Sequence, residues 1–255
     1  MTDDILTIEI DDGVATLTMN RPDKRNAMCD ALLDKIDGFF SKPPVDVKAV
    51  VLTGTAGHFC SGLDLSEHVA RDAEGTMRHS RGWHEVMDRI QFGGLPVVSA
   101  MFGAVIGGGL ELASATHVRV AEPSAFFQLP EGRRGIFVGG GASVRIGRIL
   151  GPDRMTEMML TGRKYSAEEG LALGLTHYTA GEGEALAKAR ELARKIASNA
   201  PLSNYIMIQA LARIGDMSKA DGLFTESLCA AITQTSPDAL EGLAAFLEKR
   251  SPTFR

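Results

Sequence analysis

The order of the apolar patterns restricts the fold of this chain more than any other feature of its sequence. In the first half, short runs with the apolar character of β-strands are separated by stretches in which apolar residues recur at helical spacing. Asp11, Asp12 and Gly13 are suited to a hairpin turn between the first two runs. Strands are predicted at residues 5–10, 14–19, 47–53, 96–102 and 118–121, and helices at 28–40, about 66–90 and 107–115.

From about Gly139 onwards the pattern is almost entirely helical, with breaks near glycines and prolines. Helices are predicted at 142–150, 154–161, 167–173, 184–199, 202–214, 220–232 and 237–249. The change from mixed α/β to helical patterning predicts an α/β protein with one core domain, residues 1–195, and a helical region, residues 196–255.

The composition is that of an ordinary soluble globular protein, with 44% hydrophobic and 23% charged residues. A net charge of −5 argues against a general nucleic-acid partner, which would need clustered Lys and Arg. The first ten residues have neither the basic-then-apolar layout of a secretory signal nor the Arg-rich character of a transit peptide. No apolar run reaches the roughly 18 residues of a membrane span. We therefore expect a soluble, cytoplasmic protein.

Several catalytic and metal-binding signatures are absent from the sequence. The chain has no Gly-Lys dipeptide, so the phosphate-binding P-loop pattern cannot occur. Ser143 lies in a run resembling a nucleophile elbow, but Arg145 replaces the glycine that this turn prefers. After His84, Asp88 stands where a zinc-protease helix needs its second histidine. The three cysteines are far apart and favour neither disulfides nor a structural zinc site. We expect no metal.

Glu111 is the most unusual acidic residue, because it is the only Asp, Glu, Lys or Arg between Arg89 and Arg119. Burial would raise its pKa towards the range in which acid–base catalysis is efficient. Alternatively, the acid stabilises the first turn of a helix through the helix dipole, without chemistry. The preceding glycines favour catalysis, since they let a ligand approach the backbone and leave N–H groups free to stabilise an oxyanion.

Glu131 carries a weaker local signal. It follows Pro130 in a predicted loop and precedes two arginines, Arg133 and Arg134. Taken alone, this pattern favours a surface salt bridge over a catalytic role.

Five ordered blocks of the sequence match a known pattern. Through them the chain resembles the crotonase, or enoyl-CoA hydratase/isomerase, superfamily along nearly its whole length. Within the superfamily, residues 81–85, 107–114 and 130–141 most resemble methylthioacryloyl-CoA hydratases. The five blocks are Asn20-Arg21-Pro22 with Asn26-Ala27, and residues 59–65, 103–113, 128–135 and 160–162.

The resemblance implies a crotonase-type superhelix of ββα units, with C-terminal helices that join subunits into trimers, often paired as hexamers. It makes Glu111 and Glu131 the two catalytic carboxylates. It also implies that the backbone N–H groups of Leu63 and Gly108 form an oxyanion hole for the thioester carbonyl, although the Leu63 side chain can also be a core residue. Coenzyme A enters as part of the substrate, and no separate cofactor is implied.

Further residues are expected to contact coenzyme A or the acyl chain. Phe246 and Lys249 match positions that contact coenzyme A in related enzymes, often across a subunit boundary. The alternative is that both residues only lie at an exposed helix end. Trp83 lines the acyl end of the site or is a buried helix aromatic. The residues implied to contact coenzyme A are Lys24, Arg25, Ala27, Ser61, Asp64, Leu65, Phe246 and Lys249.

These features predict an acyl-CoA hydratase, in which Glu111 accepts a proton from water while Glu131 protonates the α-carbon. The acyl group remains open between methylthioacryloyl, with release of methanethiol, and a short-chain enoyl group of β-oxidation. Val138 stands where many hydratases have proline, which leaves the pocket shape open. An enoyl-CoA isomerase commonly keeps only the second acid, so Glu111 disfavours it. A non-catalytic binding protein is disfavoured because both acids are retained and the chain lacks a basic extension.

Overall fold

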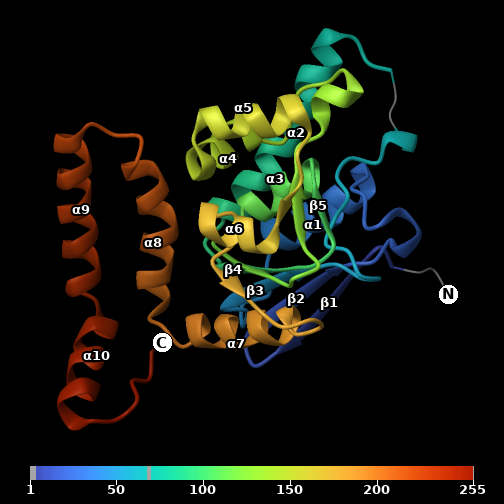
Figure 1. The fold of residues 1–255 in the computed structure, drawn as a ribbon. Coiled ribbons are helices and arrows are strands. Elements are labelled where there is room, and N and C mark those ends of the chain that lie inside the picture. The colour runs from blue at the N-terminus through green and yellow to red at the C-terminus, as the bar shows by residue number, and fades with distance from the viewer. Residues whose placement is uncertain (1–3, 68–69, 255) are drawn as a thin grey trace.

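The computed structural model describes residues 4–67 and 70–254, and these residues form two sheets and a series of helices (Figure 1). The larger sheet has six strands in the order β1-β2-β3-β4-β6-β9, and the smaller has the order β5-β7-β8. The larger sheet consists of β1 (Leu6–Asp11), β2 (Val14–Met19), β3 (Ala49–Thr53), β4 (Val97–Met101), β6 (Val118–Ala121) and β9 (Tyr178–Thr179). The smaller consists of β5 (Ala104–Ile106), β7 (Phe126–Gln128) and β8 (Tyr165–Ser166).

The predicted N-terminal hairpin is confirmed. Strands β1 and β2 pair antiparallel, with Asp11 opposite Val14. The turn residues Asp12 and Gly13 both have positive φ, 47° and 72°, as a two-residue hairpin turn requires. All later pairs of the larger sheet are parallel, so the chain returns through helices between its strands.

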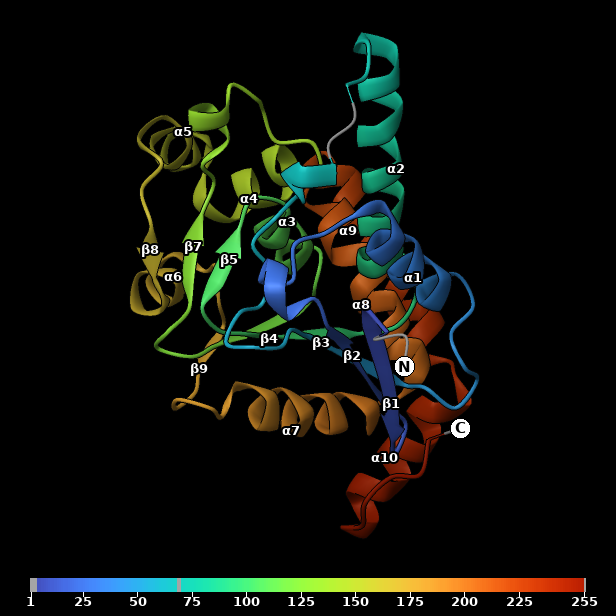
Figure 2. The same ribbon diagram turned by 90° about the vertical axis from the view of Figure 1, so that its right-hand side faces the viewer.

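Both faces of the larger sheet are buried, which explains the continuous apolar run in β3. Ala49 and Val51 face one hydrophobic cluster, together with Ala185 and Ala189 of α7 (Ala185–Ala197). Val50 and Leu52 face the main core on the opposite side. Figure 2 shows α7 beneath the sheet and α1, α2 and α3 above it.

The helices above and around the sheet follow the predicted order, but α2 starts later than predicted. Asp72 caps α2 by accepting a hydrogen bond from the Gly75 N–H at 2.7 Å, whereas residues 65–67 form a separate 3-10 turn. Residues 68 and 69, within the predicted range, lie outside the described residues. The helices of this part are α1 (Asp30–Ser41), α2 (Ala73–Phe92), α3 (Gly108–Ser114), α4 (Ala142–Leu150), α5 (Pro152–Thr161) and α6 (Ala167–Leu173).

The smaller sheet was not predicted as a sheet. Gly103 turns the chain sharply from β4 into β5; its φ is 55°, and a Cβ there would lie 2.0 Å from the Gly57 carbonyl oxygen. A short strand, which the sequence patterns did not predict, follows this turn. This strand ends at Ile106 and delivers the chain to the start of α3.

The last three helices, α8 (Pro201–Ile214), α9 (Lys219–Gln234) and α10 (Pro237–Glu248), stand beside the rest of the molecule (Figure 1). These helices carry large exposed apolar side chains, including Phe224, Leu228 and Phe246. The predicted division at residues 195 and 196 stays a prediction. Among the described residues, no helix combines the length and the apolar character that crossing a membrane requires.

Candidate active site

The loop around Gly62 approaches the start of α3 closely. A Cβ on Gly62 would lie 2.8 Å from the Ile106 carbonyl oxygen and 3.3 Å from the Gly108 nitrogen, so the two segments nearly touch. Hydrogen bonds from the Met28 N–H to the Gly62 oxygen (2.7 Å) and from the Asp64 N–H to the Met28 oxygen (2.8 Å) hold the loop in place.

The N–H groups of Leu63 and Gly108 donate to no acceptor within the described part of the chain. Gly108 is the first residue of α3, where helix geometry leaves N–H groups without an internal partner. Two free donors that lie close together can stabilise the negative charge that develops on a thioester oxygen. The structure thus places the loop that carries Leu63 against the Gly108 end of α3, where the sequence resemblance implies an oxyanion hole.

Glu111 lies on α3, one turn after Gly108, and is buried. One of its oxygens, Oε1, accepts hydrogen bonds from the backbone N–H groups of Gly140 (2.8 Å) and Ala142 (3.0 Å). Burial raises the pKa of Glu111, while these two hydrogen bonds favour its charged form and partly oppose the rise. Its second oxygen, Oε2, packs closely against Gly140, where an added Cβ would lie only 2.8 Å from it.

Glu131 is the first residue of a 3-10 turn (Glu131–Arg134), and only 7% of its surface is exposed. Its Oε2 is buried and has no hydrogen-bond partner among the described residues. Burial raises the pKa of Glu131 to about 7, and the neighbouring charge of Glu111 contributes to the rise. Glu131 is therefore not the surface salt bridge that its local sequence favours.

The two carboxyl groups lie near enough for their charges to interact, and that of Glu131 borders the glycine-rich turn before α3. A Cβ on Gly107 would lie 3.0 Å from Glu131 Oε1, and Gly107 directly precedes the free N–H of Gly108. The two acids and the two donors thus surround one small region. Such a site can polarise a carbonyl group and move protons to and from the neighbouring carbon atoms.

Arg145 is a buried residue of this site that sequence reasoning missed as a functional group. Its guanidinium pairs with Asp88 and donates to Gln91 Oε1 at 2.7 Å, both on α2. The same group reaches the Gly140 carbonyl oxygen at 3.4 Å. Arg145 therefore fixes the turn whose N–H groups hold Glu111. In the sequence, Arg145 is notable only because it replaces the glycine that a nucleophile elbow around Ser143 would need.

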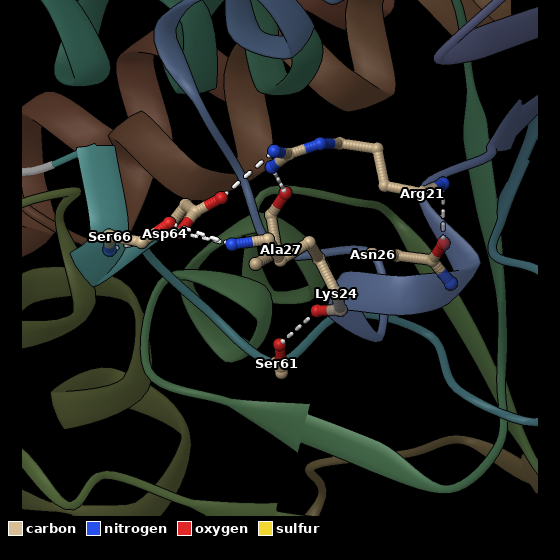
Figure 3. A network of polar contacts seen from close by, with 7 residues as sticks. All are labelled: Arg21, Lys24, Asn26, Ala27, Ser61, Asp64 and Ser66. Carbon is tan, nitrogen blue, oxygen red and sulfur yellow. Dashed lines mark hydrogen bonds and ion pairs between the residues drawn. The ribbon is translucent and has the colours of Figure 1, made fainter. Parts of the chain in front are cut away.

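A polar network holds the loops beside the oxyanion donors (Figure 3). Asp64 is buried, pairs with Arg21 at 2.8 Å and accepts hydrogen bonds from the N–H and hydroxyl of Ser66. The hydrogen bonds of Ser66, and then that of Arg21, lower the pKa of Asp64, so it is ionised at neutral pH. The carboxylate thus ties residues 21–27 to residues 61–66.

Most of the predicted coenzyme A contacts lie in or near this network. The Ser61 hydroxyl donates to the Lys24 carbonyl oxygen at 3.0 Å, and the Lys24 ammonium donates to the Ser66 hydroxyl at 2.7 Å. Ala27 is buried, and its carbonyl accepts from Arg21 at 2.6 Å. Lys24 and Arg25 are exposed, so two cationic groups lie at the rim of the site. Leu65 is 44% exposed.

Phe246 and Lys249 lie elsewhere in this chain. Phe246 is on α10 and is 79% exposed, and Lys249 ends the helix with a positive φ of 54°. Figure 1 shows α10 well away from β5 and α3, so a single chain does not bring these two residues to the site.

Comparison with known proteins gives a consistent result. The model of the enoyl-CoA hydratase/isomerase family matches residues 9–255. Human enoyl-CoA hydratase domain-containing protein 2, mitochondrial, is 34% identical over 251 residues, covering 96% of this chain and 86% of that protein. The 2,3-dehydroadipyl-CoA hydratase of Escherichia coli (strain K12) is 33% identical over 244 residues, covering 95% of each.

Solved structures agree in fold. A crystal structure of a candidate enoyl-CoA hydratase from Rhodopseudomonas palustris CGA009 superposes with a TM-score of 0.94 and 48% sequence identity. The match covers 96% of this chain and 95% of that one.

Proposed function

The chain belongs to the enoyl-CoA hydratase/isomerase family of the crotonase superfamily, and we propose that it is a hydratase that adds water across an α,β-unsaturated coenzyme A thioester. Membership supports an enzyme acting on coenzyme A thioesters, and the crotonase-type fold predicted from the sequence is confirmed. The observation that carries the hydratase assignment is the pair of buried carboxyl groups, Glu111 and Glu131, near two backbone N–H groups that have no acceptor among residues 4–67 and 70–254.

In this mechanism the N–H groups of Leu63 and Gly108 bind the thioester oxygen. Negative charge grows on this oxygen when water attacks the β-carbon, so the two hydrogen bonds strengthen in the transition state. Their effect is to make the β-carbon electrophilic and to stabilise the enolate-like intermediate.

The two acids have environments that suit opposite roles. Glu111 receives two backbone hydrogen bonds, which stabilise its anion and suit a base that accepts a proton from water. Glu131 has an oxygen with no partner in the described part of the chain and a pKa raised to about 7, which suit an acid that gives its proton to the α-carbon. The roles reverse for dehydration.

The isomerase alternative lacks such support. An isomerase moves one proton between carbon atoms and needs no water, so it has no use for a second acid held by two backbone donors. Glu111 is fixed in that way by Gly140 and Ala142.

We further propose that coenzyme A lies along residues 24–27 and 61–65, with Lys24 and Arg25 facing its phosphates. Phe246 and Lys249 would then act from a neighbouring subunit, in a trimer or a hexamer. The exposed apolar side chains of α8, α9 and α10 support this assembly, because monomeric proteins rarely expose large contiguous apolar surfaces.

The acyl group proposed from the sequence resemblance is methylthioacryloyl. Water added to its β-carbon gives a hemithioacetal, which releases methanethiol and leaves an aldehyde. Hydrolysis of the thioester then frees coenzyme A, and loss of carbon dioxide yields acetaldehyde. Incubation with methylthioacryloyl-CoA should release thiol and aldehyde; hydration of crotonyl-CoA without reaction of this substrate would identify an ordinary short-chain hydratase.

The hydratase mechanism is tested by replacing each acid separately, as Glu111→Gln and Glu131→Gln. Each change should lower kcat for hydration of crotonyl-CoA by about 10²–10⁴-fold, because acid–base catalysis contributes roughly that much. Binding of coenzyme A, measured by calorimetry, should persist. Glu168→Gln, at an exposed position in the first turn of α6, is the matched control and should keep full activity. Full activity in either site variant would exclude the mechanism.

A further inference from the structure

Trp83 occupies the space between the proposed oxyanion hole and the turn that holds Glu111. It lies on α2, is 5% exposed, and is the only tryptophan of the chain. A Cβ on Gly108 would lie 2.8 Å from its Cζ3, and a Cβ on Gly140 would lie 3.0 Å from its Cε3. One edge of the indole ring therefore packs against the backbone on both sides of the site.

This position lies in the path of a growing acyl chain. If the thioester oxygen sits at the N–H groups of Leu63 and Gly108, the α- and β-carbons lie next to Glu111 and Glu131. The Gly140 N–H holds Glu111, and the indole ring covers Gly140. Substituents beyond the β-carbon must therefore meet the ring after a short distance.

The ring is held against this turn by neighbouring contacts. The Ser80 hydroxyl, nearly one turn earlier on α2, donates to the Gly139 carbonyl oxygen at 2.6 Å. His79 packs edge-on against the indole, with ring centroids 6.3 Å apart. The indole N–H has no acceptor among the described residues. Packing and volume, rather than a hydrogen bond, therefore define what this side chain contributes.

Trp83 also borders a groove between α1 and α2, with a volume of about 400 Å³. Leu33, Val86 and Asp34 line the same groove. Because one side chain touches both the groove and the two site glycines, it separates the two spaces. Its removal would join them and provide room for a longer chain.

We propose that Trp83 is the wall that closes the acyl end of the site and restricts the enzyme to short acyl groups of crotonyl size. This inference rests on the proposed hydratase function and adds the substrate class. It gives Trp83 the role of a specificity-determining residue.

The test is hydration of trans-2-enoyl-CoA substrates with four, eight and twelve carbons. For the unmodified protein, kcat/KM should fall by at least about tenfold from four to eight carbons, because an overfilled apolar pocket discriminates by that much per step. Trp83→Ala and the milder Trp83→Leu should raise kcat/KM for eight carbons by about tenfold and lower it for four. Val86→Ala, which changes the groove but not the contacts with Gly108 and Gly140, should keep the original preference.

The outcomes separate this inference from the proposed function. Equal rates on all three chain lengths in the unmodified protein would overturn the role of Trp83 and leave the hydratase function intact. Reaction with none of them, and none with methylthioacryloyl-CoA, would instead remove the hydratase function.

A second measurement needs no variant, because the fluorescence of the chain reports on Trp83 alone among tryptophans. Saturated butyryl-CoA should change the emission spectrum, whereas free coenzyme A should not. Identical spectra with the two ligands, both bound at saturation, would contradict contact between the acyl group and the ring.

Discussion

The surroundings of the two glutamates differ in how strongly they stabilise the negative charge of the side chain. Burial raises the pKa of both, but the protein supplies two N–H donors to Glu111 and none to Glu131 Oε2 among the described residues. A donor stabilises the anion, and an unpartnered buried oxygen favours the protonated form. The assignment of base and acid thus follows from backbone geometry rather than from residue type.

The rate of hydration should depend on the ionisation of Glu131. Since this residue must be protonated to deliver its proton, kcat/KM should fall as the pH rises through about 7, approaching tenfold per unit above it. Dehydration needs the ionised form and should rise across the same interval. Initial rates in both directions from pH 5 to 9 provide the measurement. A hydration rate that increases from pH 7 to 8.5 would contradict the assignment.

The two acids also differ in how well sequence reasoning could predict them. Glu111 stands out because no other acidic or basic residue lies between Arg89 and Arg119. Glu131 has ordinary neighbours, and only its contact with the Gly107 turn, distant in sequence, explains its burial. Arg145 gave no signal for the same reason, since its partners lie more than 50 residues away on α2.

At the scale of elements, the start of α4 is the support for Glu111. Gly141 has a φ of 107°, which lets the chain present the N–H groups of Gly140 and Ala142 to one carboxylate oxygen. Arg145 on α4 and its partners on α2 fix this turn from behind. Arg145 and its partners on α2 therefore position Glu111, the proposed base, without contacting the substrate themselves.

Replacing Arg145 should disturb catalysis more than binding. Arg145→Gln removes the buried guanidinium, and a shift of the Glu111 donors by about 1 Å would lower kcat by about 10–100-fold. The KM for crotonyl-CoA should change much less. Arg148→Gln, on the same helix but in an exposed ion pair with Asp216, is the control and should leave kcat unchanged. An unchanged kcat in Arg145→Gln would show that the turn holds without it.

The elements that sequence reasoning missed are the shortest ones. Strands β5, β7, β8 and β9 are only two or three residues long. This is too short for an alternation of apolar and polar residues to be recognised in the sequence. They exist because pairing with distant strands satisfies their backbone groups. The hairpin and the longer helices were predicted, apart from the later start of α2, because turn chemistry and apolar spacing are local properties.

At the scale of the whole molecule, the last three helices expose many large apolar side chains, which is unusual for a monomeric protein. Leu223, Phe224, Leu228 and Ile232 on α9 are each at least 50% exposed. Burying them between subunits would remove this surface from water and would bring α10 near another chain. The sequence resemblance predicts this assembly, and it stays a prediction.

Sedimentation velocity should show a trimer or hexamer at micromolar concentration. Placing charges on α9, as Phe224→Asp with Leu228→Asp, should shift the protein to monomers, because the acids would be buried in an apolar interface. KM for crotonyl-CoA should rise as well if Phe246 and Lys249 of one subunit serve the next. Glu226→Lys, also on α9, should not alter the assembly. A monomeric unmodified protein would contradict the proposal.

The central claim, that this protein adds water to an enoyl thioester, is tested most directly by hydration of crotonyl-CoA in water labelled with ¹⁸O. The proposed mechanism requires the hydroxyl oxygen on the β-carbon to come from solvent. Mass spectrometry of the early product should therefore show one ¹⁸O atom in the acyl group of 3-hydroxybutyryl-CoA. A recovered acyl-CoA without a hydroxyl group, or with an unlabelled one, would contradict the account.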